Sequence, residues 1–168
     1  MDHSALETNN TLLLMQILGD VQNRSYIELV KSVENKLKAG IQDGEIDEGE
    51  APVTHHFAPN VYMRQMDAPA GSLVVSKMHR TEHFLVFLSG SLSIITDKGV
   101  EYVKAPCIHR TMPGTKRIAY FHEDSTCFTI HPTQLTDVDE IEEEIIVPEA
   151  EVDAFLESIG HTPKELEP

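Results

Sequence analysis

The sequence contains no tryptophan and only two cysteines, and these and other absences narrow the classes of protein to which it can belong. Cys107 and Cys127 lie 20 residues apart and form no CxxC pair, so no metal or redox motif of that kind is present. We expect both thiols to be reduced in a cytoplasmic protein. No apolar run approaches the roughly 20 residues that span a bilayer. The N-terminus also has no cationic region of the kind that begins a secretory signal, so we expect neither membrane insertion nor export.

Positive charge is scarce as well. The 13 Lys and Arg residues stand against 28 Asp and Glu, which gives a net charge of −15 and argues against nucleic acid as a partner. The acidity is uneven, because residues 53–133 carry a net charge of +2 and seven of the nine histidines. The flanking segments together therefore carry −17. We interpret the central stretch as the functional part and the flanks as segments that keep the protein soluble.

Periodicity divides the chain into four segments. Residues 1–40 predict an N-terminal helical segment, with one short helix over residues 12–18 and a second that begins near Ser25 and ends at Gly40. Residues 41–52 form an acidic linker, and residues 53–133 form the barrel segment described below. Residues 134–168 form an acidic C-terminal segment with one helix, which begins near Pro148 and ends at Gly160. We interpret the acidic tract over residues 137–144 as a solvated loop.

The central segment consists of short runs rich in Val, Ile, Thr, Tyr and Phe, separated by turn signals such as Ser89-Gly90 and Pro113-Gly114. Several strands at this spacing are typical of an antiparallel sandwich or barrel. No glycine-rich phosphate loop and no G-x-S-x-G elbow is present, which removes the commonest nucleotide-hydrolase and serine-hydrolase functions.

One ordered series within this segment is more specific. Gly71 is followed by Lys77, His79, His83 and Gly90 at the spacing of the first cupin motif, and Thr111 to Arg117 resembles the turn of the second motif. The stretch over residues 60–133 thus resembles a small single-domain cupin of the type found in bacteria and bacteriophages. The resemblance implies an all-β fold, the cupin β-barrel (a double-stranded β-helix or jelly roll), with the N-terminal helices and the C-terminal helix added. It also implies a homodimer.

The resemblance places four residues at the metal-ligand positions of the family, namely Lys77, His79, His83 and Arg117. Lys77 stands in place of a histidine, His83 in place of a glutamate, and Arg117 in place of the distant histidine, so the motif is degenerate. Two imidazoles alone make a poor site for Zn, Fe, Mn or Ni. His109, on the strand before the Pro113-Gly114 turn, is a candidate for the third ligand.

The same substitutions support a second hypothesis. Two cations and two imidazoles around one cavity would bind an anion, since Arg grips carboxylates or phosphates in bidentate fashion and Lys supplies a point charge. Phe87 and Phe121 would then provide apolar walls. The ligand implied by the resemblance is a small anionic metabolite or nucleotide, which the protein would bind and sequester. The alternatives are a divalent-metal enzyme of oxygenase or isomerase type, and a barrel that only scaffolds the acidic helices.

A different sequence motif overlaps the first cupin motif. Residues 79–83, His-Arg-Thr-Glu-His, also fit the H-x-x-E-H zinc-protease signature. That chemistry needs a helix, so that histidines four residues apart share one face. The flanking residues have strand character on both sides, and we therefore expect a strand and a tight connection here.

Overall fold

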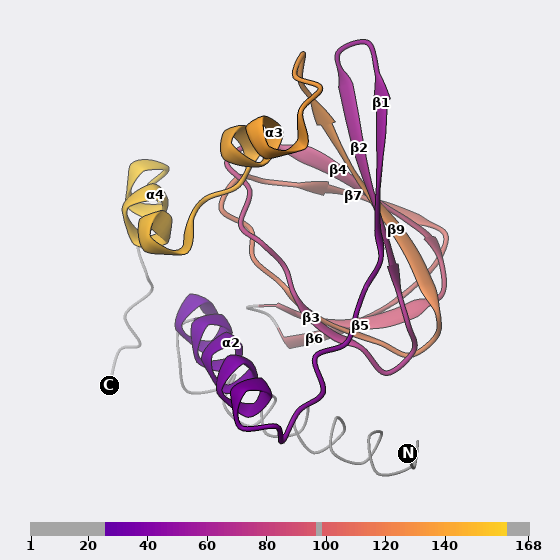
Figure 1. The fold of residues 1–168 in the computed structure, drawn as a ribbon, viewed down its shortest axis with the longest axis vertical. Coiled ribbons are helices and arrows are strands. Elements are labelled where there is room, and N and C mark those ends of the chain that lie inside the picture. Colours follow the sequence, from indigo (N-terminus) through magenta and orange to yellow (C-terminus); the bar gives the residue numbers. More distant parts are fainter. Residues whose placement is uncertain (1–25, 97–98, 161–168) are drawn as a thin grey trace.

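The computed structural model describes residues 26–96 and 99–160, and Figure 1 shows their arrangement. Two antiparallel sheets face each other, one with strand order β1-β2-β9-β4-β7 and one with order β3-β8-β5-β6. The strands are β1 (Val53–Ala58), β2 (Val61–Ala68), β3 (Leu73–Val75), β4 (His83–Ser89), β5 (Ser91–Thr96), β6 (Gly99–Lys104), β7 (Cys107–Thr111), β8 (Ile118–Phe121) and β9 (Ser125–Pro132). The helices are α2 (Tyr26–Gln42), α3 (Val138–Ile145) and α4 (Val152–Ser158), with a 3-10 turn η1 (Glu149–Glu151) before α4.

The strand order defines the fold. β2, β9, β4 and β7 form one four-stranded set and β3, β8, β5 and β6 form the other, and β1 extends the first sheet through a hairpin with β2. The order β2-β9-β4-β7 facing β3-β8-β5-β6 is that of an eight-stranded jelly roll, the architecture of cupins and of viral capsid and lectin domains. The predicted all-β barrel is therefore confirmed.

The two glycines that frame the first motif lie at turns that need them. Gly71 has a φ of 82° before β3, and Gly90 has a φ of 93° between β4 and β5. A Cβ atom at Gly90 would also lie 2.0 Å from the Ser125 hydroxyl. Side chains are unfavourable in this left-handed region, so both positions favour glycine.

The helix predicted to end at Gly40 is α2, which continues for two residues beyond that glycine. Its buried side chains Leu29, Val30 and Val33 pack against Ile95 and Ile118 on the outer face of the four-stranded sheet. A bare Cα at Gly40 allows Ile46 to approach, because a Cβ there would lie 2.6 Å from its Cδ1. The helix predicted over residues 12–18 lies outside the described residues.

The acidic tract over residues 137–144 is a helix and not the solvated loop expected from its charge. Asp137 caps α3, because its carboxylate accepts hydrogen bonds from the backbone amides of Asp139 and Glu140 at 3.0 and 3.1 Å. Acidic residues in the first turn also suit the helix dipole. Ile141 and Ile145 are buried against Tyr62. The C-terminal segment thus contains α3, η1 and α4, where one helix was expected.

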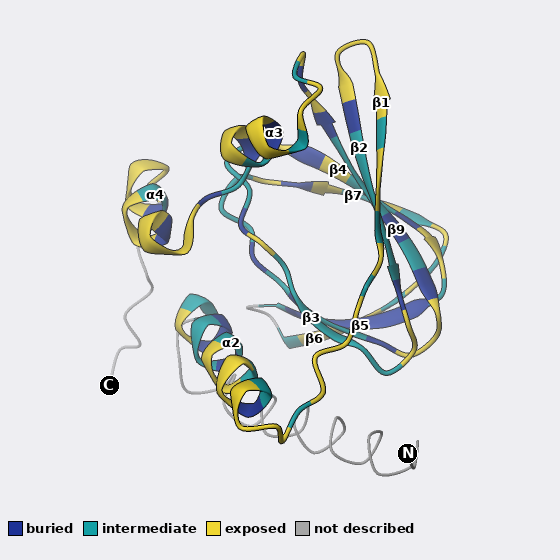
Figure 2. Ribbon diagram, in the orientation of Figure 1, coloured by how far each residue is buried: buried dark blue, intermediate teal, exposed yellow. Residues whose placement is uncertain are grey.

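Burial concentrates in the sheets and on the helix faces turned towards them (Figure 2). The closed end of the barrel is a cluster of buried apolar side chains. α3 and the segment after it lie across the opposite end, which we call the mouth (Figure 1). None of the described helices is long and apolar enough to cross a membrane.

Candidate metal and ligand site

The inner face of the five-stranded sheet is arranged in layers that follow from the strand registers. Residues directly opposite each other in an antiparallel pair share a layer, and every second residue of a strand faces inward. The mouth layer contains Tyr62, His131, His83 and Thr111, the middle layer contains Arg64, Thr129, Leu85 and His109, and the floor layer contains Met66, Cys127, Phe87 and Cys107.

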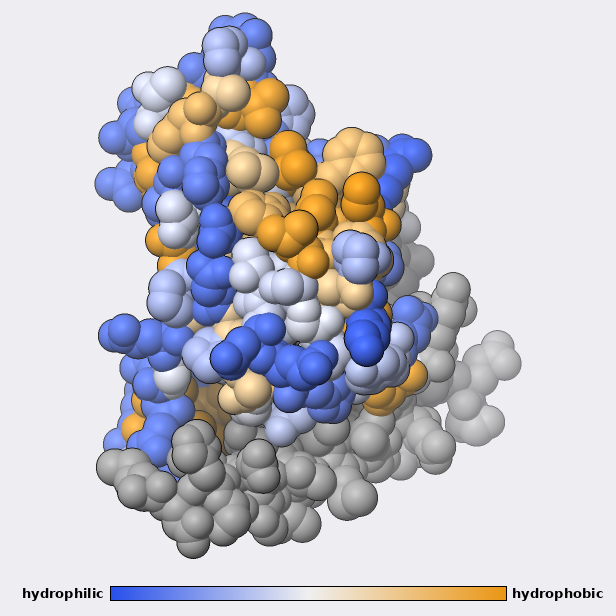
Figure 3. All heavy atoms as spheres, turned by 90° about the vertical axis from the view of Figure 1, so that its right-hand side faces the viewer, coloured by the Kyte–Doolittle hydropathy of each residue, from blue (hydrophilic) through white to orange (hydrophobic). Residues whose placement is uncertain are grey.

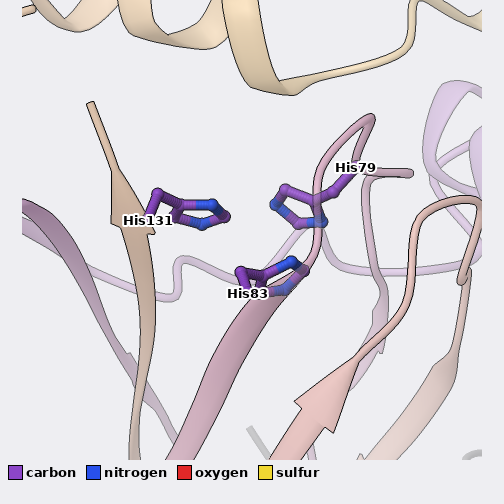
Figure 4. A group of neighbouring side chains, drawn as sticks. All are labelled: His79, His83 and His131. Atoms are coloured by element: carbon purple, nitrogen blue, oxygen red, sulfur yellow. The ribbon is translucent and has the colours of Figure 1, made fainter. Parts of the chain in front are cut away.

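Three histidines converge at the mouth (Figure 4). One ring nitrogen from each of His79, His83 and His131 lies within 4.8 Å of the others. The ring centroids are 4.3 Å apart for His79 and His83, 4.5 Å for His83 and His131, and 5.1 Å for His79 and His131. Among the described residues, no other group of three His, Cys, Asp or Glu side chains has ligand atoms close enough to hold a metal ion.

Each ring is positioned by a different element. His83 begins β4, and its Nδ1 donates a hydrogen bond to the Thr81 carbonyl at 3.1 Å, which leaves the Nε2 lone pair available as a ligand. His79 lies between β3 and β4, where it forms a bridge with Ile146 and its carbonyl accepts from the Gly114 amide at 3.0 Å. The segment that carries His79 is therefore fixed to the chain crossing the mouth.

His131 differs from the other two. It is fully buried near the end of β9, and neither of its ring nitrogens has a hydrogen-bond partner. A buried polar group without a partner is costly, so most such groups have a functional explanation. A metal ion would give a partner to the ring nitrogen that carries the lone pair.

The triad is electrically neutral. Burial lowers the pKa of His79 to about 3 and that of His131 to about 4, and the neighbouring imidazoles contribute to both shifts. Burial also lowers the pKa of His83. Neutral imidazole is the form that ligates metals, so the residues fit a metal ion.

Below the triad lies a cavity of about 270 Å³ inside the barrel. Its walls are largely apolar, and its charged lining consists of Arg64, Lys77, Arg117 and Glu142. Arg117 donates to the Thr111 hydroxyl at 3.1 Å, and burial lowers its pKa. Lys77 pairs with Glu142 of α3 at 3.0 Å. The two arginines therefore leave an excess of positive charge in a strongly acidic protein.

The structure brings together only some of the residues predicted from the sequence. His79, His83, Arg117, Phe87 and Phe121 all line the cavity. Lys77 reaches its rim, but 57% of its side chain is exposed, and Glu142 neutralises it. Lys77 is therefore poorly placed to grip a ligand inside the barrel.

His109, the predicted third metal ligand, lines the cavity one layer below the triad, opposite Leu85. Its Nε2 lies 3.4 Å from the Cys107 sulfur. His131 takes the place next to His79 and His83 instead. His109 and His131 both face inward, but His131 lies in the mouth layer and His109 in the middle layer.

The residues that the sequence did not identify include Tyr62, Arg64 and Thr129, which line the cavity, and His131, which lies opposite Tyr62. Tyr62 and Arg64 share one face of β2, and Thr129 and His131 share one face of β9. The local sequence does not show which face of either strand is turned into the barrel. The H-x-x-E-H alternative is not supported by the structure, since residues 79–83 are not helical and Glu82 pairs with Arg110 at the surface.

Comparison with known proteins gives the following results. No family model matches the chain, and no curated protein matches it. A cupin domain from Bordetella pertussis is 14% identical over 52% of this chain and 98% of its own, with a TM-score of 0.42. A double-stranded β-helix protein from Klebsiella pneumoniae is 18% identical over 55% and 84%, with a TM-score of 0.45. The EutQ protein of Clostridium difficile is 12% identical over 49% and 68%, with a TM-score of 0.41.

The strand order of the two sheets assigns the fold by itself. The protein has a jelly-roll barrel of the kind found in cupins, and the inside of this barrel has polar side chains at one end and apolar side chains at the other.

Proposed function

We propose that the barrel binds a divalent transition metal through His79, His83 and His131, and a small anionic molecule beside it. The observation that carries this proposal is His131, a buried histidine with two unpartnered ring nitrogens facing two other neutral imidazoles. Imidazole ligands suit Zn, Fe, Ni and Cu, and three protein ligands leave coordination positions open.

An anionic ligand is supported by Arg64 and Arg117. Both line the cavity, and no carboxylate among the described residues forms an ion pair with either of them. A ligand carboxylate or phosphate would supply the missing negative charge. A metal-free receptor built on Lys77 is less well supported, because that lysine pairs with Glu142.

An enzymatic role is the second candidate, because a metal held by only three protein ligands would have room to bind a substrate. A metal with three histidine ligands would supply Lewis-acid or redox chemistry to a molecule bound next to it. The residues of this chain would hold the metal, orient an anionic substrate through the arginines and exclude water through the apolar walls. These roles are compatible with either an oxygenase or an isomerase.

Elemental analysis of untagged protein, purified without chelator, tests the proposal. We expect about one transition metal per chain, which disappears in the His79→Ala/His83→Ala double variant. The Arg110→Met variant is a suitable control, because Arg110 is an exposed residue that pairs with Glu82 on the outside of the barrel. Wild-type protein that neither contains nor takes up a transition metal would contradict the proposal.

We also propose that two copies of the chain pair through the outer face of the five-stranded sheet. Phe84, Leu88 and Ile108 are 52%, 54% and 69% exposed on β4 and β7. Figure 3 shows apolar side chains gathered on one side of the molecule, with hydrophilic side chains around them. Apolar patches of this kind commonly mark interfaces, and Arg110, which lies opposite Phe84 on this face, pairs with Glu82, so the two charges offset each other.

Sedimentation equilibrium tests this pairing. The wild type is expected to be a dimer and the Ile108→Asp variant a monomer with an intact fold. A wild type that sediments as a monomer at every concentration would overturn the pairing but leave the metal proposal unaffected.

A further inference from the structure

We infer that the anionic group of the ligand is a carboxylate bound by Arg64 and Thr129 in the middle layer, and that the rest of the ligand is a compact apolar group on the barrel floor. This inference deepens the proposed function and rests on it in one respect, since the ligand shares the cavity with the metal. It names two residues that the cupin resemblance did not indicate.

Arg64 places a positive charge inside the cavity. It projects from β2 into the cavity, and its charge contributes to the lowered pKa values of His79 and His131 above it and acts on the Cys127 thiol below it. The guanidinium charge therefore affects the pKa of groups both above it, at the mouth, and below it, at the floor. It forms no ion pair with any carboxylate in the described part of the chain. A cationic group facing an apolar cavity requires a counter-charge.

Thr129 supplies the second, independent observation. Its hydroxyl is buried in the cavity wall and has no hydrogen-bond partner. Arg64 and Thr129 are directly opposite each other in the pairing of β2 with β9. Side chains paired in this way have Cβ atoms roughly 5 Å apart, so one group can contact both. A guanidinium and a hydroxyl donor side by side suit a planar carboxylate.

The floor of the cavity, below Arg64 and Thr129, favours an apolar group in the rest of the ligand. Phe87, Leu92 and Phe121 are almost fully buried there, and Met66 and Val103 pack against them. No charged residue belongs to this cluster. The apolar part of a ligand would replace water on the partly buried side chains that line the cavity above them, such as Met66, Leu85 and Val103, which is favourable.

The size of the cavity limits the ligand. At about 270 Å³ it is smaller than the roughly 300–1,000 Å³ of ordinary drug-sized pockets. A nucleotide would also place a polar sugar and base against the apolar floor, which carries no partner for them. The favoured class is therefore a small aryl or branched-chain carboxylic acid.

The test uses metal-loaded full-length protein and calorimetric titration with three probes, namely phenylacetate, its neutral counterpart phenylacetamide, and AMP. We expect phenylacetate to bind and the other two to bind at least ten-fold more weakly. The Arg64→Met variant should lose at least ten-fold in phenylacetate affinity, and the nearly isosteric Thr129→Val variant should lose a few-fold. The Arg110→Met variant, which removes an exposed arginine, should bind like the wild type.

The inference is overturned if Arg64→Met and Thr129→Val both bind phenylacetate as the wild type does, if AMP binds more tightly, or if phenylacetate does not bind. Circular dichroism of each variant identifies any that has failed to fold. If Arg64→Met does not fold, the affinity of Thr129→Val for phenylacetate tests the inference alone. Elemental analysis of the same samples separates the two proposals. Retained metal without acid binding overturns only this inference, whereas acid binding to protein that takes up no metal overturns only the metal site.

Discussion

The open and closed ends of this barrel are built from the same strands, yet their chemistry is opposite. β4 runs from His83 at the mouth to Phe87 at the floor, and β9 runs from Cys127 at the floor to His131 at the mouth. Phe87 and Phe121 pack in a buried apolar cluster, while His131 is equally buried and lacks hydrogen-bond partners. The closed end stabilises the fold, whereas the unpartnered polar groups at the open end reduce that stability.

The largest effect on stability is expected at the closed end. Phe87→Ala removes a ring that is 2% exposed, and both the lost burial and the new cavity destabilise the protein. The expected loss is about 3–5 kcal/mol in the free energy of unfolding, measured by urea denaturation. A loss below about 1 kcal/mol would show that the floor is not packed as described.

Acid provides the next largest effect and acts on the open end. The pKa of His131 is about 4 in the folded protein against 6.5 for an ordinary histidine, so the unfolded chain binds a proton first as the pH falls. Stability from this residue is therefore complete above pH 6.5 and is lost progressively down to about pH 4. By linkage the loss is about 3 kcal/mol.

Comparing metal-free wild type with the His131→Asn variant isolates this contribution from that of the many carboxylates. The wild type should lose more stability than the variant between pH 7 and pH 4, as measured by urea denaturation at each pH. Parallel curves for the two proteins would show that His131 has an ordinary pKa.

The smallest effect is expected at the rim. Lys77 occupies a metal-ligand position of the cupin motif, but its side chain is largely exposed and pairs with Glu142 at 3.0 Å. Exposed ion pairs contribute about 0–1 kcal/mol, so Lys77→Ala should change neither stability nor metal content by much. Loss of the metal in this variant would instead place Lys77 inside the site.

Much of the barrel can be predicted from the sequence because turns are local. The glycines at positions 71 and 90 mark tight connections that need a positive φ, and the strand-rich runs lie between such signals. The helix α3 was not predicted because the high negative charge of residues 137–144 was given more weight than the spacing of their apolar side chains. Asp137 as a cap, followed by Ile141 and Ile145 four residues apart, carried the helical signal.

The site could be predicted only in part, for a reason of geometry. His79 and His83 belong to one local motif, so their spacing shows that they come together. His131 joins them through the pairing of β4 with β9, strands far apart in sequence whose register no local pattern reveals. His109 also faces inward, but the register of β7 places it one layer deeper. Spacing alone does not separate these two histidines.

That distinction gives the most direct test of the central claim, that His131 completes the metal site. The measurement is the metal content, per chain, of wild type, His131→Asn and His109→Asn proteins purified side by side without chelator. We predict about one transition metal in the wild type and in His109→Asn, and little or none in His131→Asn. Full metal content in His131→Asn, with loss in His109→Asn, would contradict the account.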